Sequence, residues 1–225
     1  MAKIFVSTNK SDVNNVIELN KKAGFKNFTT FESEHFSLVV FKKKIHPIDN
    51  FYQDNNGNFA ALVGTGFYNG VNGVEALKGI LADFHSNVAR IQERTIGNYL
   101  LAIYKEGSLY FVTDTYQVIK SYYTEYDNGW AVSNDFSSLM STKGQLTDDS
   151  VDYFGLLSET FLVSSFSKNT LIKNINRLFG FEYLCTNNDE LSIQHMGHRK
   201  NIYDLSKLTR QKIAEDYTTL IRACP

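Results

Sequence analysis

Residues 97–139 contain three short apolar segments separated by turn residues, and this alternation constrains the fold more than any other stretch of the chain. The three segments are Tyr99–Tyr104, Ser108–Thr113 and Trp130–Ser133. A turn at Glu106-Gly107 separates the first two, and another at Asp127-Asn128-Gly129 precedes the third. Short apolar runs bounded by Gly, Asn and Asp are typical of strands joined by tight turns. This stretch therefore predicts an antiparallel sheet.

Further strands and helices are predicted on both sides of this stretch. Strand-like composition occurs at Lys3–Ser7, Phe36–Phe41, Phe59–Val63, Glu182–Thr186 and Leu191–His195. Helical spacing of apolar residues occurs at Asp12–Ala23 (capped by Ser11 and ended by Gly24), Val74–His85, Ser150–Leu157 (begun by Asp148-Asp149) and Lys207–Ala223. The clearest apolar stripe consists of Leu77, Ile80, Leu81 and Phe84. Many strands with a few amphipathic helices predict an α+β fold of two packed, mostly antiparallel sheets with helices outside. We expect Lys3–Ser7 in the interior of one sheet and Val74–His85 on an outer face.

The composition indicates an ordered protein without a strong charge bias. The chain has 225 residues, a net charge of −1 and 14% aromatic residues, so a packed core is expected. Basic residues are dispersed apart from Lys42-Lys43-Lys44, which we interpret as a solvated strand end, and no nucleic-acid partner is predicted. No apolar run reaches the ~18 residues of a membrane span, and no signal peptide is evident. Cys185 and Cys224 lack metal-site or redox spacing, so a reduced, cytoplasmic protein without a metal is expected.

Several short motifs occur in a fixed order along the chain. They are Gly97-Asn98-Tyr99, Thr113-Asp114, Tyr122-Tyr123, Ser133-Asn134 and the segment Thr170–Leu178, which is followed by a glycine and a strand. Over roughly residues 57–205 this order resembles the amino-terminal domain of asparagine synthetases and other class II glutamine amidotransferases. The resemblance implies the four-layer αββα sandwich of the Ntn-hydrolase superfamily, with residues 1–205 forming the domain.

The same resemblance implies a glutaminase pocket from which the reactive groups are missing. In active members the residue after Met1 is a cysteine, whose thiolate attacks the glutamine amide while its own α-amine serves as base. The residue here is Ala2. The family's Asn-Gly-Glu-x-Tyr-Asn segment aligns with residues 64–69, so Gly64 replaces an oxyanion donor and Gly66 replaces an acid. The family's substrate-binding Arg-Leu-Ser-Ile stretch has no counterpart around Phe36–Lys44.

We therefore expect no catalytic residue in this chain. Ala2 occupies the position of the nucleophile, and Gly64, Thr65 and Gly66 mark a degenerate pocket. The residues expected to remain as scaffold are Tyr68, Asn69, Gly97, Asp114, Tyr122 and Tyr123.

Other candidate groups have ordinary structural explanations. Ser7 or Thr8 would be the nucleophile of a self-processed enzyme, but a strand-to-helix turn explains the same letters. His195 and His198 would have to bind a metal from opposite faces of an extended segment, so a solvated turn is the simpler interpretation. For Asp114, hydrogen bonding to the loop before Tyr122 is favoured over catalysis. The tyrosine pair is interpreted as core and sheet-face packing.

Residues 206–225 are interpreted as a helix that opens a missing second domain. In asparagine-synthetase-like enzymes that domain carries a Ser-Gly-Gly-x-Asp-Ser loop for the pyrophosphate of ATP, and these 225 residues contain no such loop. The resemblance predicts a glutaminase-deficient domain that supports a synthetase domain, in cis or in trans, in an ATP-dependent, amide-forming enzyme. β-Lactam synthetase shows the same departure from the family.

The predicted chain is inactive alone and needs no cofactor, since ATP and Mg²⁺ are implied only for the synthetase domain. If that domain is absent, the stripe of Ile213, Tyr217, Leu220 and Ile221 predicts a homodimer. The alternative function is a stand-alone, non-enzymatic interaction or ligand-binding module on the same scaffold.

Overall fold

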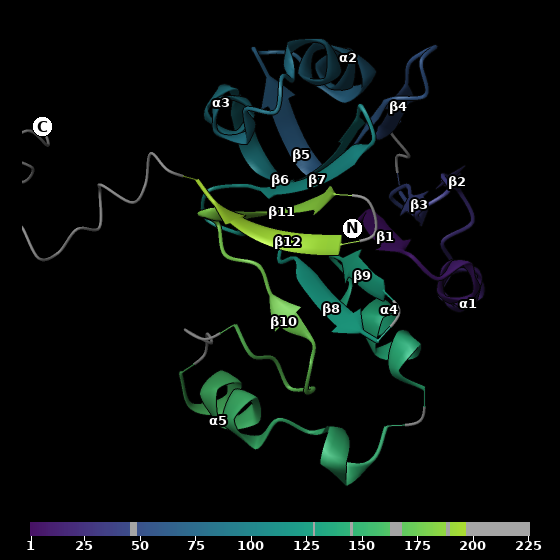
Figure 1. The fold of residues 1–225 in the computed structure, drawn as a ribbon, viewed down its shortest axis with the longest axis vertical. Coiled ribbons are helices and arrows are strands. Elements are labelled where there is room, and N and C mark those ends of the chain that lie inside the picture. Colours follow the sequence, from purple (N-terminus) through teal and green to yellow (C-terminus); the bar gives the residue numbers. More distant parts are fainter. Residues whose placement is uncertain (46–48, 128, 145, 163–167, 188–189, 197–225) are drawn as a thin grey trace, which may run out of the picture. The chain divides into compact units, whose positions relative to one another are not determined.

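The computed structural model describes residues 1–45, 49–127, 129–144, 146–162, 168–187 and 190–196 (Figure 1). The described residues up to His195 form one compact unit. The predicted helix Lys207–Ala223, the predicted boundary at residue 205, His198 and Cys224 lie outside the described residues.

Two antiparallel sheets make up the centre of this unit (Figure 1). In the first sheet the strand order is β10 (Asn176–Arg177), β8 (Tyr122–Tyr126), β9 (Gly129–Ser133), β1 (Lys3–Ser7), β3 (Ser37–Phe41) and β2 (Phe28–Glu32). In the second sheet it is β12 (Glu190–His195), β11 (Glu182–Asn187), β7 (Ser108–Thr113), β6 (Thr95–Lys105), β5 (Phe59–Tyr68) and β4 (Phe51–Gln53). Strand β1 pairs with β3 on one side and β9 on the other, which confirms that Lys3–Ser7 is an interior strand.

The core between the sheets is built from alternate residues of their strands. Ile4 and Val6 of β1 belong to it together with Ala61 and Val63 of β5, whereas Phe5 belongs to a second cluster. Successive side chains of a strand point to opposite faces, so each sheet also buries an outer face. The second cluster joins Phe5 to Val16 of helix α1 (Lys10–Lys22), which covers the outer face of the first sheet.

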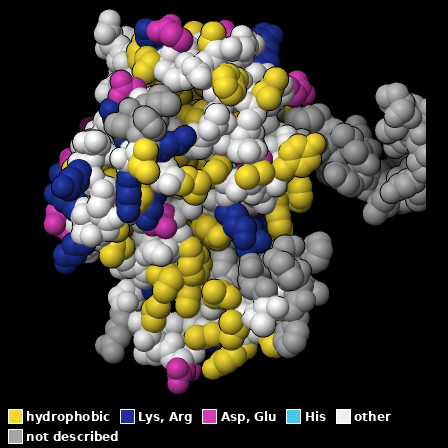
Figure 2. All heavy atoms as spheres, turned by 180° about the vertical axis from the view of Figure 1, so that it is seen from behind, with side chains coloured by type: hydrophobic (Ala, Val, Ile, Leu, Met, Phe, Trp, Pro, Cys, Tyr) yellow, Lys and Arg dark blue, Asp and Glu magenta, His cyan; other side chains and the backbone are white. Residues whose placement is uncertain are grey.

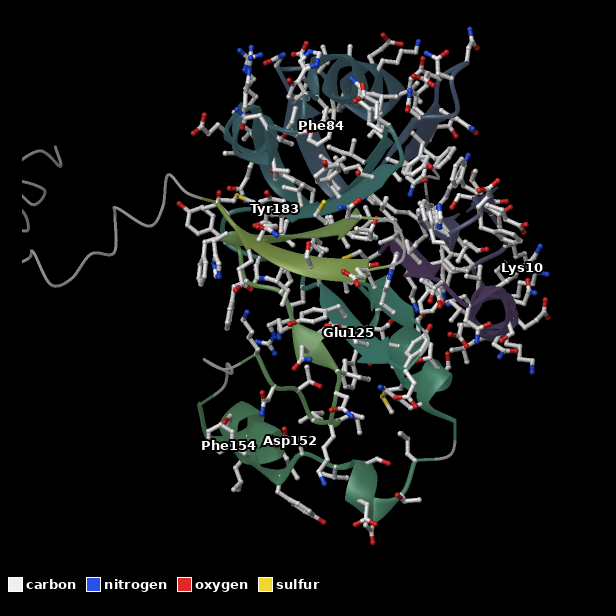
Figure 3. All side chains as sticks on the ribbon, viewed as in Figure 1. Lys10, Phe84, Glu125, Asp152, Phe154 and Tyr183 are labelled. Atoms are coloured by element: carbon white, nitrogen blue, oxygen red, sulfur yellow. The ribbon has the colours of Figure 1, made fainter. Side chains whose placement is uncertain are left out.

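The outer face of the second sheet is covered by helices α2 (Gly73–Asp83) and α3 (Val88–Arg94) (Figure 1). The predicted stripe Leu77, Ile80, Leu81 and Phe84 is buried, and Phe84 lies between α2 and the sheet (Figure 3). The predicted α+β fold, a four-layer αββα sandwich of two antiparallel sheets, is therefore confirmed. None of the helices in the described part of the chain is both long enough and apolar enough to cross a membrane.

Two predicted helix starts were wrong because the capping side chain is another residue. Helix α1 begins two residues earlier, at Lys10, since the side chain of Asn9 accepts a hydrogen bond from the Ser11 amide. Helix α5 (Tyr153–Leu162) begins after the predicted start, because Asp152 accepts from the Gly155 amide at 2.9 Å. Asp148-Asp149 lie instead in a separate short 3₁₀ turn, Asp148–Ser150.

Several short elements have no counterpart in the sequence prediction. They are the edge strands β2, β4 and β10, the strand β8, the helices α3 and α4 (Phe136–Met140) and the 3₁₀ turn Ser141–Lys143. Strands β5 and β6 are also longer than predicted, and the extra residues Gly64, Thr65 and Gly66 of β5 line the candidate site described next.

Candidate functional site

A cavity of about 110 Å³ lies at the end of the second sheet, between strand β5 and the first turns of helix α2. Its described lining comes from four segments of the chain. Ala2 lies before β1, and Lys43, Asp49 and Asn50 lie between β3 and β4. Strand β5 contributes Leu62, Gly64, Thr65 and Gly66, and the start of α2 contributes Asn72, Gly73, Ala76 and Leu77. The structure thus brings Ala2 together with the three predicted positions of the degenerate pocket.

Hydrogen bonds hold the segment around Ala2 against the first sheet. The side chain of Asn134 donates to the Ala2 carbonyl oxygen at 3.2 Å and accepts from the Ile4 amide at 2.8 Å. The ammonium group of Lys3 donates to Asp135 at 2.7 Å and to Asn20 at 2.8 Å. Ala2 is only 3% exposed, so its methyl group forms a fixed part of the cavity wall.

The backbone of β5 and β6 requires glycine at the cavity. Gly64 has a φ of +106°, and a Cβ atom there would lie 2.2 Å from the carbonyl oxygen of Asn98. Gly97 on β6 has a φ of +133°, and its Cβ would lie 2.2 Å from the carbonyl oxygen of Thr65. Side chains at these positions would therefore be strained and would also collide with the neighbouring strand. Gly64 therefore has a structural role, which is to let β5 approach β6 closely, and the comparison with the family's motif did not reveal this role.

The scaffold residues Tyr68 and Asn69 lie at the end of β5, outside the cavity lining. The buried hydroxyl of Tyr68 donates to Asp83 at 2.8 Å, and Arg94 donates to the same carboxylate at 3.4 Å. Burial, followed by the bond to Asp83, raises the pKa of Tyr68. Asn69 has a φ of +49° in the turn that leads to α2. Both residues connect β5 to the helices above it.

Asp114 fixes the loop that follows β7. The residue is 2% exposed, and its carboxylate accepts hydrogen bonds from the backbone amides of Tyr99, Tyr116, Val118 and Ile119 at 3.3, 3.0, 3.3 and 3.4 Å. Four amide donors account for both carboxylate oxygens. Asp114 also does not belong to the described cavity lining.

Tyr122 and Tyr123 point to opposite faces of the first sheet. Tyr123 belongs to the core between the sheets, and Tyr122 packs edge-on against Phe136 on the outer face. Burial, together with the carboxylates of Glu182 and Glu125, raises the pKa of Tyr123 to about 12, so its hydroxyl stays neutral near pH 7. Neither ring lines the cavity.

Ser7 is fully buried within a polar cluster at the opposite end of β1 from Ala2. Its hydroxyl lies 2.7 Å from the Tyr126 hydroxyl and donates to Asp12 at 3.1 Å. It also accepts from the Asn9 amide at 3.0 Å. Thr8 accepts from the Trp130 amide at 3.1 Å. These hydroxyls connect the end of β1 to the start of α1, and they are about 16 Å along the strand from the cavity.

Lys43, Asp49, Asn50 and the start of α2 are lining residues that sequence reasoning missed. Lys43 belongs to the basic run that we interpreted as a solvated strand end, and Asp49 forms an ion pair with Lys42. Asn50 donates to the Phe41 carbonyl at 3.4 Å, and its buried Oδ1 has no hydrogen-bond partner among the described residues. No local sequence signal marks these positions, because they meet the cavity only through the fold.

The described lining contains no cysteine, serine or histidine, and Thr65 supplies its hydroxyl. Among the described residues, no three His, Cys, Asp or Glu side chains gather in a way that could hold a metal ion. His195, at the end of β12, instead stacks on Phe181. The arrangement can enclose a small molecule but offers no activated nucleophile.

No protein-family model and no curated protein matches the chain. Solved structures of larger enzymes are similar to it at low identity. The glutamine phosphoribosylpyrophosphate amidotransferase from B. subtilis, complexed with ADP and GMP, is 9% identical with a TM-score of 0.46, over 86% of this chain and 49% of that one. An allosteric regulatory enzyme of purine biosynthesis is 7% identical with a TM-score of 0.48, over 86% of this chain and 43% of that one. The chain thus spans less than half the length of either.

Proposed function

We propose that this chain is a glutaminase-deficient, asparagine-synthetase-like domain that supports an ATP-dependent, amide-forming synthetase domain. The observation that carries the proposal is the cavity in which the Ala2 methyl group meets Gly64 and Gly66. A methyl group can neither attack an amide nor carry an acyl group. In this proposal the cavity is the remnant of a glutaminase site and lacks the chemistry of that site.

ATP and Mg²⁺ belong to the partner domain in this proposal. The described residues contain no cluster of carboxylates suited to a metal ion, and the sequence contains no Ser-Gly-Gly-x-Asp-Ser loop. This chain would contribute surface and shape to the partner, which would carry out adenylation and amide formation.

A surface suited to such a partner is present on helix α5. Tyr153, Phe154 and Leu157 are 63%, 65% and 54% exposed on this one helix, and Phe154 projects from it (Figure 3). Clusters of large exposed apolar side chains mark interaction sites on soluble proteins. The partner is therefore expected to cover α5.

Co-expression tests this role. We expect the chain to co-purify with a synthetase polypeptide encoded as its continuation or neighbour, and to increase that polypeptide's ATP-dependent amide formation. Replacing Phe154 and Leu157 with serine should abolish co-purification. Tyr116→Ser is the matched control, because Tyr116 is 86% exposed on a different loop. Equal loss of binding in both variants, or full amide formation without this chain, would contradict the proposal.

A ligand-binding role is the second candidate, and the cavity favours it. The space beside Ala2 is open and not filled by larger side chains. A chain that had only a structural role would be expected to fill such a space, because empty volume in a protein weakens packing.

A further inference from the structure

The cavity walls are mostly apolar. Ala2, Leu62, Ala76 and Leu77 contribute aliphatic groups, and the glycines of β5 contribute backbone without side chains. An apolar cavity of about 150 Å³ is large enough to hold benzene and stays dry without it. A cavity of about 110 Å³ is therefore large enough for an aliphatic chain of three or four carbons.

The cavity also carries one uncompensated positive charge. Lys42 is paired with Asp49, and the Lys44 ammonium lies 4.7 Å from the centre of the Phe25 ring. Lys43, between them, lines the cavity and has no carboxylate partner in the described part of the chain. Figure 2 shows lysine and arginine side chains gathered at the side of the molecule formed by α1, β2 and β3. Acidic side chains lie among them, since Lys10 pairs with Glu32 and Lys21 with Glu18, so the ammonium group of Lys43 is the charge that would attract an anion to the cavity.

We propose that the cavity binds a short aliphatic monocarboxylate, of about four carbons, with its alkyl chain against Ala2, Leu62 and Leu77 and its carboxylate at Lys43. Apolar burial of the chain and a charge-assisted hydrogen bond to the ammonium group together define this ligand class. The inference rests on the proposed function in one respect: a cavity without an activated nucleophile binds its ligand and does not react with it.

An α-amino acid fits the cavity less well than a simple carboxylate does. Its ammonium group would need an acceptor, and the carboxylate of Asp49 is already engaged by Lys42. The side-chain acceptors that remain in the described lining are neutral, and they are the buried Oδ1 of Asn50 and the side-chain oxygens of Thr65 and Asn72. Butyrate, butylamine and norvaline therefore separate the possibilities, because they share an n-propyl group and differ in the charged groups attached to it.

Titration of the ¹⁵N-labelled full chain with each compound provides the test. Gly64, Gly66 and Gly73 line the cavity, whereas Gly107 and Gly144 do not, so their amide signals report whether binding is local. We expect butyrate to shift the first three signals and leave the other two unchanged. Butylamine should cause no shift, and norvaline should bind at least about tenfold more weakly than butyrate, because its ammonium group would meet neutral acceptors and no free carboxylate.

Charge variants test the role of Lys43. Lys43→Gln should weaken butyrate binding roughly tenfold, the size of effect expected for a lost charge-assisted hydrogen bond. Lys43→Arg should retain binding, and Lys44→Gln is the matched control that should change nothing. Butylamine or norvaline binding as tightly as butyrate, unchanged affinity in Lys43→Gln, or shifts outside the cavity would overturn the proposal. Ammonia release from glutamine would contradict the proposed function instead, so the two failures are distinguishable.

Discussion

Replacing Gly64 with alanine is expected to destabilise the protein by about 3–4 kcal/mol, whereas replacing Gly57 is expected to cost about 1–2 kcal/mol. Both residues have a positive φ, +106° for Gly64 and +82° for Gly57, so both variants share the backbone strain of an L residue. A Cβ at Gly57 meets nothing within 4 Å, whereas a Cβ at Gly64 would lie 2.2 Å from the Asn98 carbonyl oxygen. The difference in the free energy of unfolding between the two variants therefore measures the cost of the steric collision at position 64.

Urea unfolding of the native protein and of the Gly64→Ala and Gly57→Ala variants measures this difference directly. Equal losses in free energy of unfolding for the two variants would show that β6 moves away from position 64 without cost. The result bears on function, because the same collision prevents an asparagine at position 64 from restoring an oxyanion donor by a single substitution.

Asp114→Ala is expected to lower the free energy of unfolding by roughly 3 kcal/mol. The substitution removes a buried acceptor and leaves the amides of Tyr116, Val118 and Ile119 without the carboxylate that binds them. Asp149→Ala is the matched control, since Asp149 is exposed and surface changes of this kind stay within about 0.5 kcal/mol.

The same urea unfolding experiment measures the Asp114 and Asp149 variants. A loss below about 1 kcal/mol for Asp114→Ala would mean that water replaces the carboxylate, and that the loop after β7 does not depend on it.

The central strands and helix α2 were predictable because their patterns are local and regular. Short apolar runs bounded by turn residues identified β6, β7 and β9, and the stripe Leu77, Ile80, Leu81 and Phe84 identified α2. Helix α3 was missed because seven residues are too few for a clear period. Its cap was a usable signal, since the side chain of Asn87 accepts from the Arg90 amide at 3.1 Å. Strand β2 is an edge strand with mixed burial, so it shows no clean alternation.

The candidate site was only half predictable from the sequence. The resemblance supplied Ala2 and residues 64–66, and the structure places them around one cavity. Lys43, Asn50 and Gly73 belong to segments that carry no motif, and only the fold brings them to the cavity. The requirement for glycine at position 64 also depends on Asn98, the partner of Thr65 on the neighbouring strand. Such cross-strand constraints are tertiary and leave no local pattern.

Glutamate production from glutamine is the measurement that tests the account most directly. We expect the purified native chain to release no glutamate or ammonia above a buffer blank, because the described cavity lining offers no activated nucleophile. The Ala2→Cys variant, with removal of Met1 verified by mass spectrometry, should also fail, since Gly64 and Gly66 leave the oxyanion and the substrate amine without partners. Glutamine hydrolysis by the native chain would contradict the central claim, and hydrolysis by the variant would show that Ala2 alone separates this cavity from an active glutaminase site.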